Sequence, residues 1–489
     1  MVVDELALAR IKQEELTKRE RDLGEEVSRT RMEIEANGSR IEDLARANAP
    51  INLLPPEILS YVLELVAFPM LRFPRHFRPI ILGLAKVSSA WRNIIFNSPK
   101  FWNHIDFDPR ADMSFVKEHV ERSCQYPLDI AIRYMDADSQ LSTLMDVIVP
   151  HVHRWRTLEI FENFEGSLEL ILGKINHLKF PSLFRVIISS FAIEDMQYPT
   201  FLRPENSPSL KSLQLDNLTL TDELLPGKGV TDLSLKFSSH PFGPLVLSSL
   251  LSPQQLTTLK LVYSTSLSLQ PESISLPSLT SLTLEAKHPR GLISAIIAPR
   301  LTCFCLITPA STDQLSTAFH GFESKFPNVH HFEFHANHGS TSIVDAECVS
   351  AVFPNVRHVK LHTTEVDDFF RMGVDDSGSC PADNWQWLES LTFNEMKICH
   401  PSSTNHFIQW LHEWNSDDLP MLHVKFTLCI FHSEHGNASD FSTPRSLLYL
   451  HNALREICIL DLRGVAVRAS VFMSLTSASP PQLVCLCIK

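Results

Sequence analysis

The sequence is poor in glycine and contains none of the common catalytic motifs, and both absences exclude classes of protein. Only 15 of the 489 residues are glycine, whereas nucleotide-binding loops need glycines where the backbone approaches a phosphate. The Gly-x-x-x-x-Gly-Lys-Ser/Thr, Gly-x-Gly-x-x-Gly, His-Glu-x-x-His and Gly-x-Ser-x-Gly patterns are missing. We therefore expect a protein that is not an enzyme and that binds no cofactor.

Basic charge and long apolar runs are scarce as well. The chain has 43 Lys and Arg against 56 Asp and Glu, a formal net charge of −13, so we expect no nucleic-acid partner, which would need clustered basic residues. No apolar run approaches the about 18 residues of a membrane-spanning helix, and residues 1–10 do not resemble a signal peptide. The ten scattered cysteines then indicate reduced thiols. These features predict a cytoplasmic or nuclear protein without a membrane partner.

Residues 1–46 contain no proline and no aromatic residue, and their apolar residues follow a heptad pattern. Such a pattern predicts either a coiled coil or a long solvated helix that leads into the next domain. The sequence leaves both alternatives open. The apolar seam positions are Val2, Leu6, Ala9, Leu16, Leu23, Val27, Ile34, Ile41 and Leu44, and the polar ones are Gln13, Glu20, Thr30 and Asn37.

Residues 51–110 carry two predicted short helices. Pro55 and Pro56 suit the first turn of the first helix, because proline lacks the N–H that this turn leaves unpaired. A second helix is expected to run through Leu82, Val87 and Trp91, with an end near Ser98-Pro99. Two short amphipathic helices bury little apolar surface on their own, so we expect this segment to meet a partner.

The same segment resembles an F-box, whose pattern runs Leu-Pro-x-Glu-Ile-Leu, then Val-Ser-x-x-Trp-Arg, then a proline followed by tryptophan. The link Phe68–Pro79 is longer than in most members of the family. The matching residues are Leu54, Pro55, Glu57, Ile58, Leu59, Val87, Ser88, Trp91, Arg92, Pro99 and Trp102.

The resemblance, which extends to the large fungal family of F-box proteins, implies a partner. An F-box binds the Skp-type adaptor of a cullin-RING ubiquitin ligase, so the adaptor and the cullin scaffold are the expected partners. The residues expected at the adaptor contact are Leu54, Pro55, Ile58, Leu59, Val87 and Trp91, supported by Phe101 and Trp102.

From residue 155 onward, apolar residues recur at positions i, i+3 and i+5. Thirteen such triplets run from Trp155/Leu158/Ile160 to Leu483/Leu486/Ile488, and their starts lie 20 to 33 residues apart. This spacing is the period of a leucine-rich repeat, in which each unit buries its leucines against its neighbours. A proline often precedes the triplet, as in Phe326-Pro-Asn-Val and Phe353-Pro-Asn-Val, where it can enter a strand without a hydrogen-bond donor.

The predicted fold is therefore multidomain. An all-α N-terminus, made of a coiled-coil-like helix at 1–46 and F-box helices at 51–110, precedes an α/β leucine-rich-repeat solenoid with a parallel sheet at 115–489. Helices are expected at Asp313–Phe326 and Asn405–Trp414. Loops are expected at Gly373–Asp383 and Glu434–Arg445.

The alternation of side chains along a strand predicts three rows of residues on the face opposite the apolar triplets. Three interpretations of this face compete: a solvated polar surface, a surface that binds acidic or phosphorylated segments and strengthens as histidine protonates, and a Cys-His metal site. The pairs Cys303/Cys305 and Cys485/Cys487 and the His432–His435 stretch have too few neighbouring ligands to indicate zinc. The rows are Cys303, His331 and His358; Cys305, Glu333 and Lys360; and Ile307, His335 and His362, with Ser390 and His423 continuing the first.

The resemblance to an F-box implies the substrate-recognition subunit of a Skp-cullin-F-box type ubiquitin ligase, with the repeats binding a protein substrate that the sequence does not identify. The face containing His331, Glu333, His335, His358, Lys360 and His362 is the expected substrate surface. A non-catalytic interaction scaffold without any link to ubiquitination remains the alternative.

Overall fold

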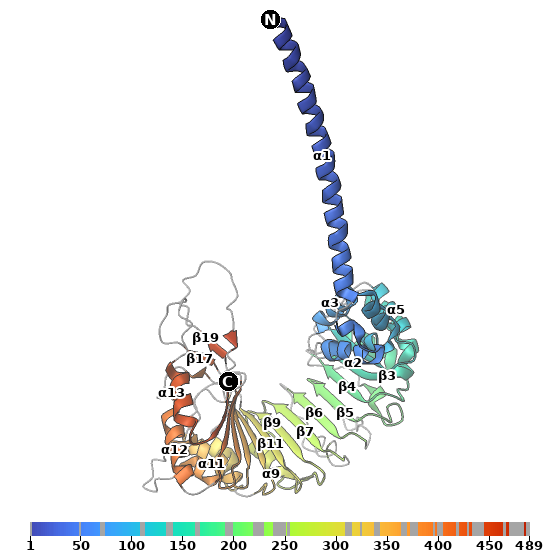
Figure 1. Ribbon diagram of the computed structural model, residues 1–489. Coiled ribbons are helices and arrows are strands. Elements are labelled where there is room, and N and C mark those ends of the chain that lie inside the picture. The colour runs from blue at the N-terminus through green and yellow to red at the C-terminus, as the bar shows by residue number, and fades with distance from the viewer. Residues whose placement is uncertain are drawn as a thin grey trace. The chain divides into compact units, whose positions relative to one another are not determined.

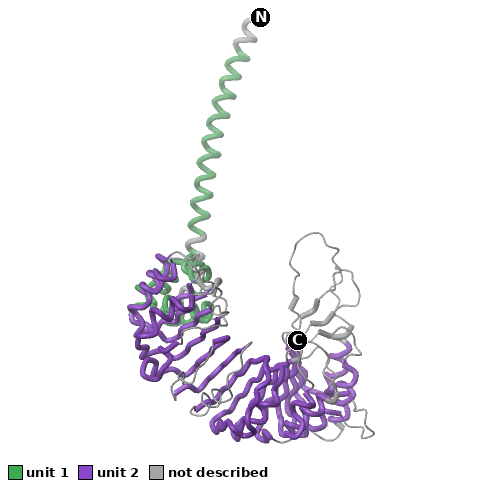
Figure 2. Tube along the Cα trace, turned by 180° about the vertical axis from the view of Figure 1, so that it is seen from behind, with its two compact units in different colours: residues 1–103, 121–124 green, residues 104–120, 125–489 purple. Residues whose placement is uncertain are grey.

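The structure is a computed structural model of the 489-residue chain. It describes residues 2–47, 50–68, 74–107, 113–133, 140–161, 167–190, 199–218, 229–237, 251, 255–308, 315–322, 325–336, 343–362, 369–371, 380–394, 397–398, 404–416, 420–427, 430–432, 445–462, 466–468 and 484–485. The chain divides into two compact units, as Figure 2 shows. Unit 1 holds Met1–Asn103 and Glu121–Cys124, and unit 2 holds the remainder.

Unit 1 is helical. It begins with the 46-residue helix α1, Val2–Ala47, which confirms the expected N-terminal helix. The 3-10 helix η1 (Pro50–Leu53), α2 (Pro56–Ala67), α3 (Pro74–Leu84), α4 (Ser89–Asn97) and η3 (Pro99–Phe101) follow. As predicted, the proline pair stands at the start of a helix, with Pro55 at the N-cap of α2.

The second helix predicted for residues 51–110 is in fact two helices, so that prediction is wrong. α3 ends at Leu84 and accommodates Pro79 in its interior, within the segment expected to be a link. Ser88 then adopts an extended conformation, and its hydroxyl accepts a hydrogen bond from the Trp91 backbone N–H at 3.2 Å. This N-cap satisfies a donor at the start of α4 and separates it from α3.

The core of unit 1 forms where α2 packs against α3 and α4. The indole N–H of Trp102 donates to the Ile95 carbonyl at 2.8 Å, so its one polar atom is satisfied inside the core. Arg122 lies over the rings of Phe96 and Trp102. The buried apolar residues of this core are Leu59, Leu63, Ala67, Ile81, Ala85, Trp91, Ile95, Phe101 and Trp102.

Unit 2 is built on a sheet of 14 strands in which each strand pairs with the next in parallel. Figure 1 shows these strands side by side, with helices along one face. The strands, in sheet order, are β1 (His104–Phe107), β2 (Leu128–Arg133), β3 (Trp155–Phe161), β4 (Arg185–Ser189), β5 (Ser212–Asp216), β6 (Asp232–Phe237), β7 (Thr258–Tyr263), β9 (Ser281–Ala286), β11 (Cys303–Thr308), β12 (His331–Ala336), β13 (His358–His362), β14 (Ser390–Asn394), β16 (His423–Thr427) and β18 (Ile459–Asp461).

The connections between these strands hold the helices and two small sheets. The helices are α5 (Met113–Arg122), α6 (Gln140–Ile148), η4 (Val149–Arg154), α7 (Ser167–Ile175), η5 (Thr200–Leu202), α9 (Arg290–Ala295), α10 (Leu315–Phe319), α11 (Ile343–Val352), η7 (Pro381–Asn384), α12 (Asn405–Ser416) and α13 (Arg445–Leu454). One small sheet pairs β8 (Ile274–Ser275) with β10 (Ile296–Ile297). The other contains β15 (Lys397–Ile398), β17 (Ile430–His432), β19 (Ala466–Arg468) and β20 (Val484–Cys485).

The apolar triplets predicted most of this sheet correctly. On strands such as β7 and β9, burial alternates from residue to residue because every second side chain faces the core. A row of packed aromatic rings, including Phe304, Phe332 and Phe353, fills the core beneath the central strands.

Near the C-terminus two triplets depart from the prediction and a third is untested. Met421 is 51% exposed, and its neighbour Leu422 is buried instead. Ile459 is 55% exposed, because Leu460 is the residue in register with the buried Val424. The final triplet, Leu483/Leu486/Ile488, lies outside the described residues.

Two other boundaries differ from those predicted. The F-box segment was expected to end at residue 110, but the first stretch of unit 1 ends at Asn103 because His104–Phe107 pairs with β2 in the sheet of unit 2. Within Asp313–Phe326 the structure describes only one short helix, Leu315–Phe319, whereas α12 covers the whole of Asn405–Trp414. Most of the predicted loops at 373–383 and 434–445 lies outside the described residues.

The residue after the strand-entry proline connects one repeat to the one before it. Asn355 donates its side-chain amide to the Pro327 carbonyl at 2.9 Å, and Asn328 donates to the Pro299 carbonyl at 2.8 Å. The hydroxyl of Ser209 makes the same bond to Pro181 at 2.7 Å. The Pro-Asn and Pro-Ser pairs of the sequence therefore form hydrogen bonds that stack the repeats.

Candidate functional site

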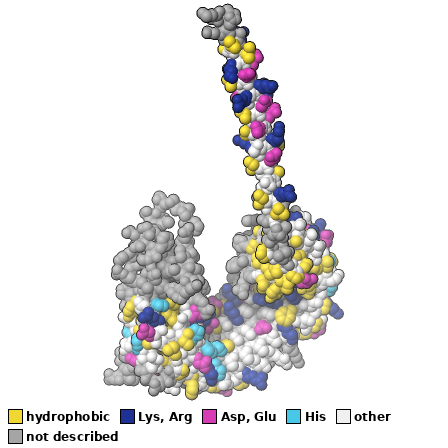
Figure 3. All heavy atoms as spheres, viewed as in Figure 1, with side chains coloured by type: hydrophobic (Ala, Val, Ile, Leu, Met, Phe, Trp, Pro, Cys, Tyr) yellow, Lys and Arg dark blue, Asp and Glu magenta, His cyan; other side chains and the backbone are white. Residues whose placement is uncertain are grey.

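An exposed apolar surface lies on α2, opposite the core of unit 1. Leu59, Leu63 and Ala67 of this helix are buried and stand four residues apart. Ile58, Tyr61 and Leu65 stand three or four residues apart on another face, where they are 50%, 59% and 57% exposed. In Figure 3, hydrophobic side chains gather on this part of unit 1. The large exposed apolar residues between positions 58 and 87 are called the apolar surface. They are Ile58, Tyr61, Leu65, Val66, Leu82 and Val87.

The structure separates the predicted adaptor-contact residues into two groups. Pro55, Ile58 and Val87 are exposed, and Leu54 is half-buried against the core. The other four are buried: Leu59 at 3% exposure, Trp91 at 9%, Phe101 at 0% and Trp102 at 2%. A side chain inside the core cannot touch a partner, so these four support the surface from beneath.

Tyr61, Leu65, Val66 and Leu82 belong to the apolar surface but were not among the predicted contact residues. The family motif gives the residue type at each position, but it does not separate side chains that face inward from those that face outward. The helical period could have found Tyr61 and Leu65, because they follow Ile58 by three and seven residues.

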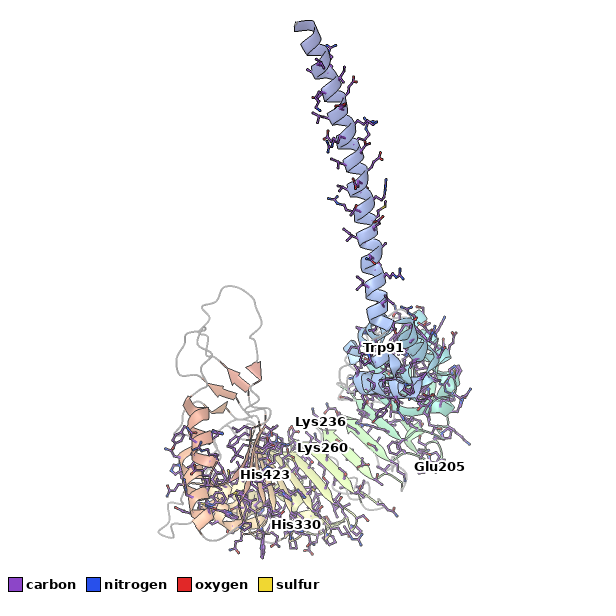
Figure 4. The ribbon with its side chains drawn as sticks, in the orientation of Figure 1. Trp91, Glu205, Lys236, Lys260, His330 and His423 are labelled. Atoms are coloured by element: carbon purple, nitrogen blue, oxygen red, sulfur yellow. The ribbon has the colours of Figure 1, made fainter. Side chains whose placement is uncertain are left out.

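In unit 2, the three predicted rows of polar residues are confirmed on the open face of the sheet, meaning the face opposite the apolar triplets. Cys303 lies in register with His331, and His331 with His358. The other two rows have the same register, and Ser390 and His423 continue the first row as expected. Figure 3 shows histidines gathered near the C-terminal strands, and Figure 4 shows where Lys236, Lys260 and His423 lie.

Glu333 is the centre of a hydrogen-bond network on this face. One of its carboxylate oxygens, Oε1, lies 2.9 Å from His335 Nε2, 2.8 Å from His362 Nε2 and 2.7 Å from Lys360 Nζ. The bonds from the two histidines hold the pKa of Glu333 well below its usual range, so it stays ionised. Asn394 Nδ2 lies 2.9 Å from the other ring nitrogen of His362. Glu333 therefore fixes the position of three side chains that could otherwise contact a partner.

His331 and His358 form a second pair, with ring centroids 4.4 Å apart. Burial, followed by the neighbouring His358 and His330, lowers the pKa of His331, so the ring stays neutral at pH 7. Ser390 Oγ lies 2.8 Å from His358 Nδ1. His331 therefore offers a ring face and hydrogen-bonding nitrogens rather than positive charge.

The first two rows line a hollow of about 430 Å³. Donor atoms of Cys305, Glu333 and His335 lie within 4.8 Å of one another, as metal ligands could. However, Lys360 occupies the carboxylate, and burial followed by Glu333 raises the pKa of the Cys305 thiol to about 12, which keeps it protonated. The arrangement suits hydrogen bonding to a polar segment better than metal binding. The residues that touch the hollow are Ser281, Thr283, Cys303, Phe304, Cys305, His331, Phe332, Glu333, His358, Val359, Lys360, Ser390 and Thr392.

The remaining predicted features fall partly outside the described residues. This applies to Cys487 and to His435, so the corresponding pairs have no structural outcome. Six cysteines within the described ranges form no disulfide: Cys124, Cys303, Cys305, Cys348, Cys380 and Cys458. In the part of the chain that the structure covers, no helix is long and apolar enough to cross a membrane.

Comparison with known proteins assigns no family to this chain. No protein-family model matches it, and no curated protein matches it. Among solved structures, the leucine-rich repeat-containing protein LegL7 from Legionella pneumophila is similar at a TM-score of 0.34 and 12% sequence identity, over 64% of this chain and 91% of that one. The function is therefore argued from the two surfaces described above.

Proposed function

We propose that this chain is the substrate-recognition subunit of a Skp-cullin-F-box type ubiquitin ligase. The observation that carries the proposal is the apolar surface on α2, where Ile58, Tyr61 and Leu65 are all at least half exposed although unit 1 has its own core. A contiguous exposed apolar patch beside a complete core is typical of a protein-protein interface. The F-box-like order of residues in the same segment favours a Skp-type adaptor as the partner.

Charge supports the same assignment. Residues 51–110 hold 7 Lys and Arg against 4 Asp and Glu, although the whole chain carries a net charge of −13. A locally basic segment in an acidic chain favours an acidic partner surface, because opposite charges speed association and fix orientation.

Unit 2 supplies the second half of the proposed function. Its 14 parallel strands would form a leucine-rich-repeat solenoid that binds a protein substrate on the open face, around the hollow beside Glu333. The chain itself would perform no chemistry. It would hold the substrate near a conjugating enzyme bound elsewhere on the cullin, which raises the effective concentration of the substrate lysines.

A binding assay with two variants tests the adaptor contact. The double variant Ile58→Asp, Leu65→Asp places two charges on the apolar surface and leaves the buried residues of α2 in place. Losing the burial of two such side chains costs about 3 kcal/mol or more, so binding to an immobilised Skp-type adaptor should weaken roughly a hundredfold. Phe184→Asp, at a residue of unit 2 that is 50% exposed, is the matched control and should bind like the wild type.

Equal binding by the wild type and the double variant would contradict the proposal, provided that circular dichroism shows the helices intact. A chain that binds other proteins but no adaptor would instead be an interaction scaffold without a link to ubiquitination.

A further inference from the structure

The long helix α1 exposes an apolar seam to solvent. Every side chain described between Leu8 and Ile41 is exposed. Nine large apolar residues of the helix are at least half exposed, and six of them, Leu16, Leu23, Val27, Ile34, Ile41 and Leu44, occupy seam positions of the heptad pattern. A 46-residue helix with such a seam has no core of its own to bury it.

The residue types along the seam favour one kind of partner. When the seam is divided into its two alternating positions, a and d, Val27, Ile34 and Ile41 occupy a, whereas Leu16 and Leu23 occupy d. β-branched residues at a and leucine at d favour two parallel strands, because each then packs into the matching hole of an identical helix.

The charges that flank the seam agree with a parallel pair of identical helices. In a parallel dimer, a g residue faces the e residue five positions later on the other helix. Glu26 at g would face Arg31 at e, and Glu5 would face Arg10. The remaining e positions, Val3, Thr17, Gly24, Gly38 and Ala45, carry no charge, so no like-charged g and e pair arises.

We propose that α1 is a dimerisation element, which pairs in parallel with α1 of a second copy of this chain. The two copies meet along the seam from Leu16 to Leu44. Glu20 is the weak point, since it occupies an a position where it would face Glu20 of the second copy. A dimer presents two apolar surfaces and two open faces, so a partner with two recognition segments would bind with avidity.

The test measures the mass of the full chain in solution by sedimentation equilibrium. The wild type should give about twice the 55.4 kDa of one chain at micromolar concentration. Leu23→Asp with Ile34→Asp, which places charge in the seam, should give the mass of one chain, whereas Glu20→Leu should lower the dissociation constant at least tenfold. Ile11→Asp with Met32→Asp alters exposed apolar residues off the seam and should leave the dimer intact.

Direction is tested with Gln13→Cys. In a parallel dimer this cysteine faces its own counterpart, so oxidised glutathione should produce a disulfide-linked dimer that the wild type does not form. The proposal would be overturned by a wild type that is monomeric or by a dimer that survives Leu23→Asp with Ile34→Asp. It would also be overturned if the off-seam variant lost the dimer to the same extent as the seam variant. A dimer without the Gln13→Cys crosslink would overturn the parallel arrangement.

Discussion

At the scale of single residues, Glu333 shows how one carboxylate can organise the open face of the sheet. It accepts three hydrogen bonds through the same oxygen, and its side chain is 31% exposed. The three donors are therefore held in place before any partner arrives. Pre-ordered side chains lose less entropy on binding, which suits a recognition surface.

Replacing this carboxylate should lower stability in a pH-dependent way. Glu333→Gln removes the charged acceptor of His335, His362 and Lys360, and we expect a loss of about 1 kcal/mol at pH 7 for so partly exposed a group. Because the folded state lowers the pKa of Glu333, its contribution is present above the unfolded value of 4.5 and is lost as the pH falls below it. Urea unfolding at pH 7 and pH 3 measures this.

The control for that experiment is Glu285→Gln on the same open face, on β9, two strands from β12. It should leave the unfolding midpoint almost unchanged at both pH values. An equal loss in the two variants would mean that the network around Glu333 adds no stability.

A half-buried histidine gives the second residue-scale prediction. Burial lowers the pKa of His104 from 6.5 to about 4, and Asp129 only partly opposes this effect. The folded state therefore holds His104 neutral, so its stability is complete above pH 6.5 and declines as the pH falls toward 4. The decline amounts to about 3 kcal/mol.

Unfolding free energies of the wild type and His104→Gln, measured from pH 7 to pH 4, test this. The variant should lose less stability than the wild type over that range. His153→Gln, at an exposed histidine, should follow the wild type. Parallel curves for all three proteins would show that His104 does not contribute.

At the scale of elements, the repeats of unit 2 are held by more than their apolar triplets. The side chains of Asn328 and Asn355 each donate to a proline carbonyl one repeat earlier. Because each repeat contacts mainly its neighbours, these bonds act at the interfaces that decide the stability of the stack.

Removing both asparagines should weaken the stack locally. Asn328→Ala with Asn355→Ala should cost about 1 to 3 kcal/mol in total and should increase hydrogen exchange in β12 and β13 more than in β2 and β3. Arg300→Ala, at the same turn position of the preceding repeat, is an exposed control and should change neither quantity. Uniform exchange changes along the sheet would argue against a local role.

Elements also show where sequence reasoning succeeds. The rows on the open face could be predicted because strand alternation and a repeated triplet together fix the register. The split between α3 and α4 could not, because it depends on the cap at Ser88 and on a helix that tolerates Pro79. At Ile459 a shift of one residue exchanged the inward and outward faces, since side chains alternate with period two.

At the scale of the whole molecule, the sequence separated the two units better than it identified their surfaces. The F-box-like motif marked the segment that carries the apolar surface but mixed buried residues such as Trp91 and Phe101 with exposed ones such as Ile58. The convergence of His335, His362 and Lys360 on one oxygen depends on side-chain conformations, which no pattern in the sequence specifies. Burial therefore shows which residues face outward, and the hydrogen bonds show which side chains converge, and the motif specifies neither.

Calorimetric titration of a Skp-type adaptor into the intact chain tests the central claim most directly. The account predicts one adaptor per chain and a negative heat-capacity change, because the apolar surface around Ile58, Tyr61 and Leu65 leaves water on binding. It also predicts that Ile58→Asp with Leu65→Asp abolishes the heat of binding. The account would be contradicted if the wild type gave no heat of binding at 25 °C or at other temperatures. Equal binding by the double variant would contradict it as well.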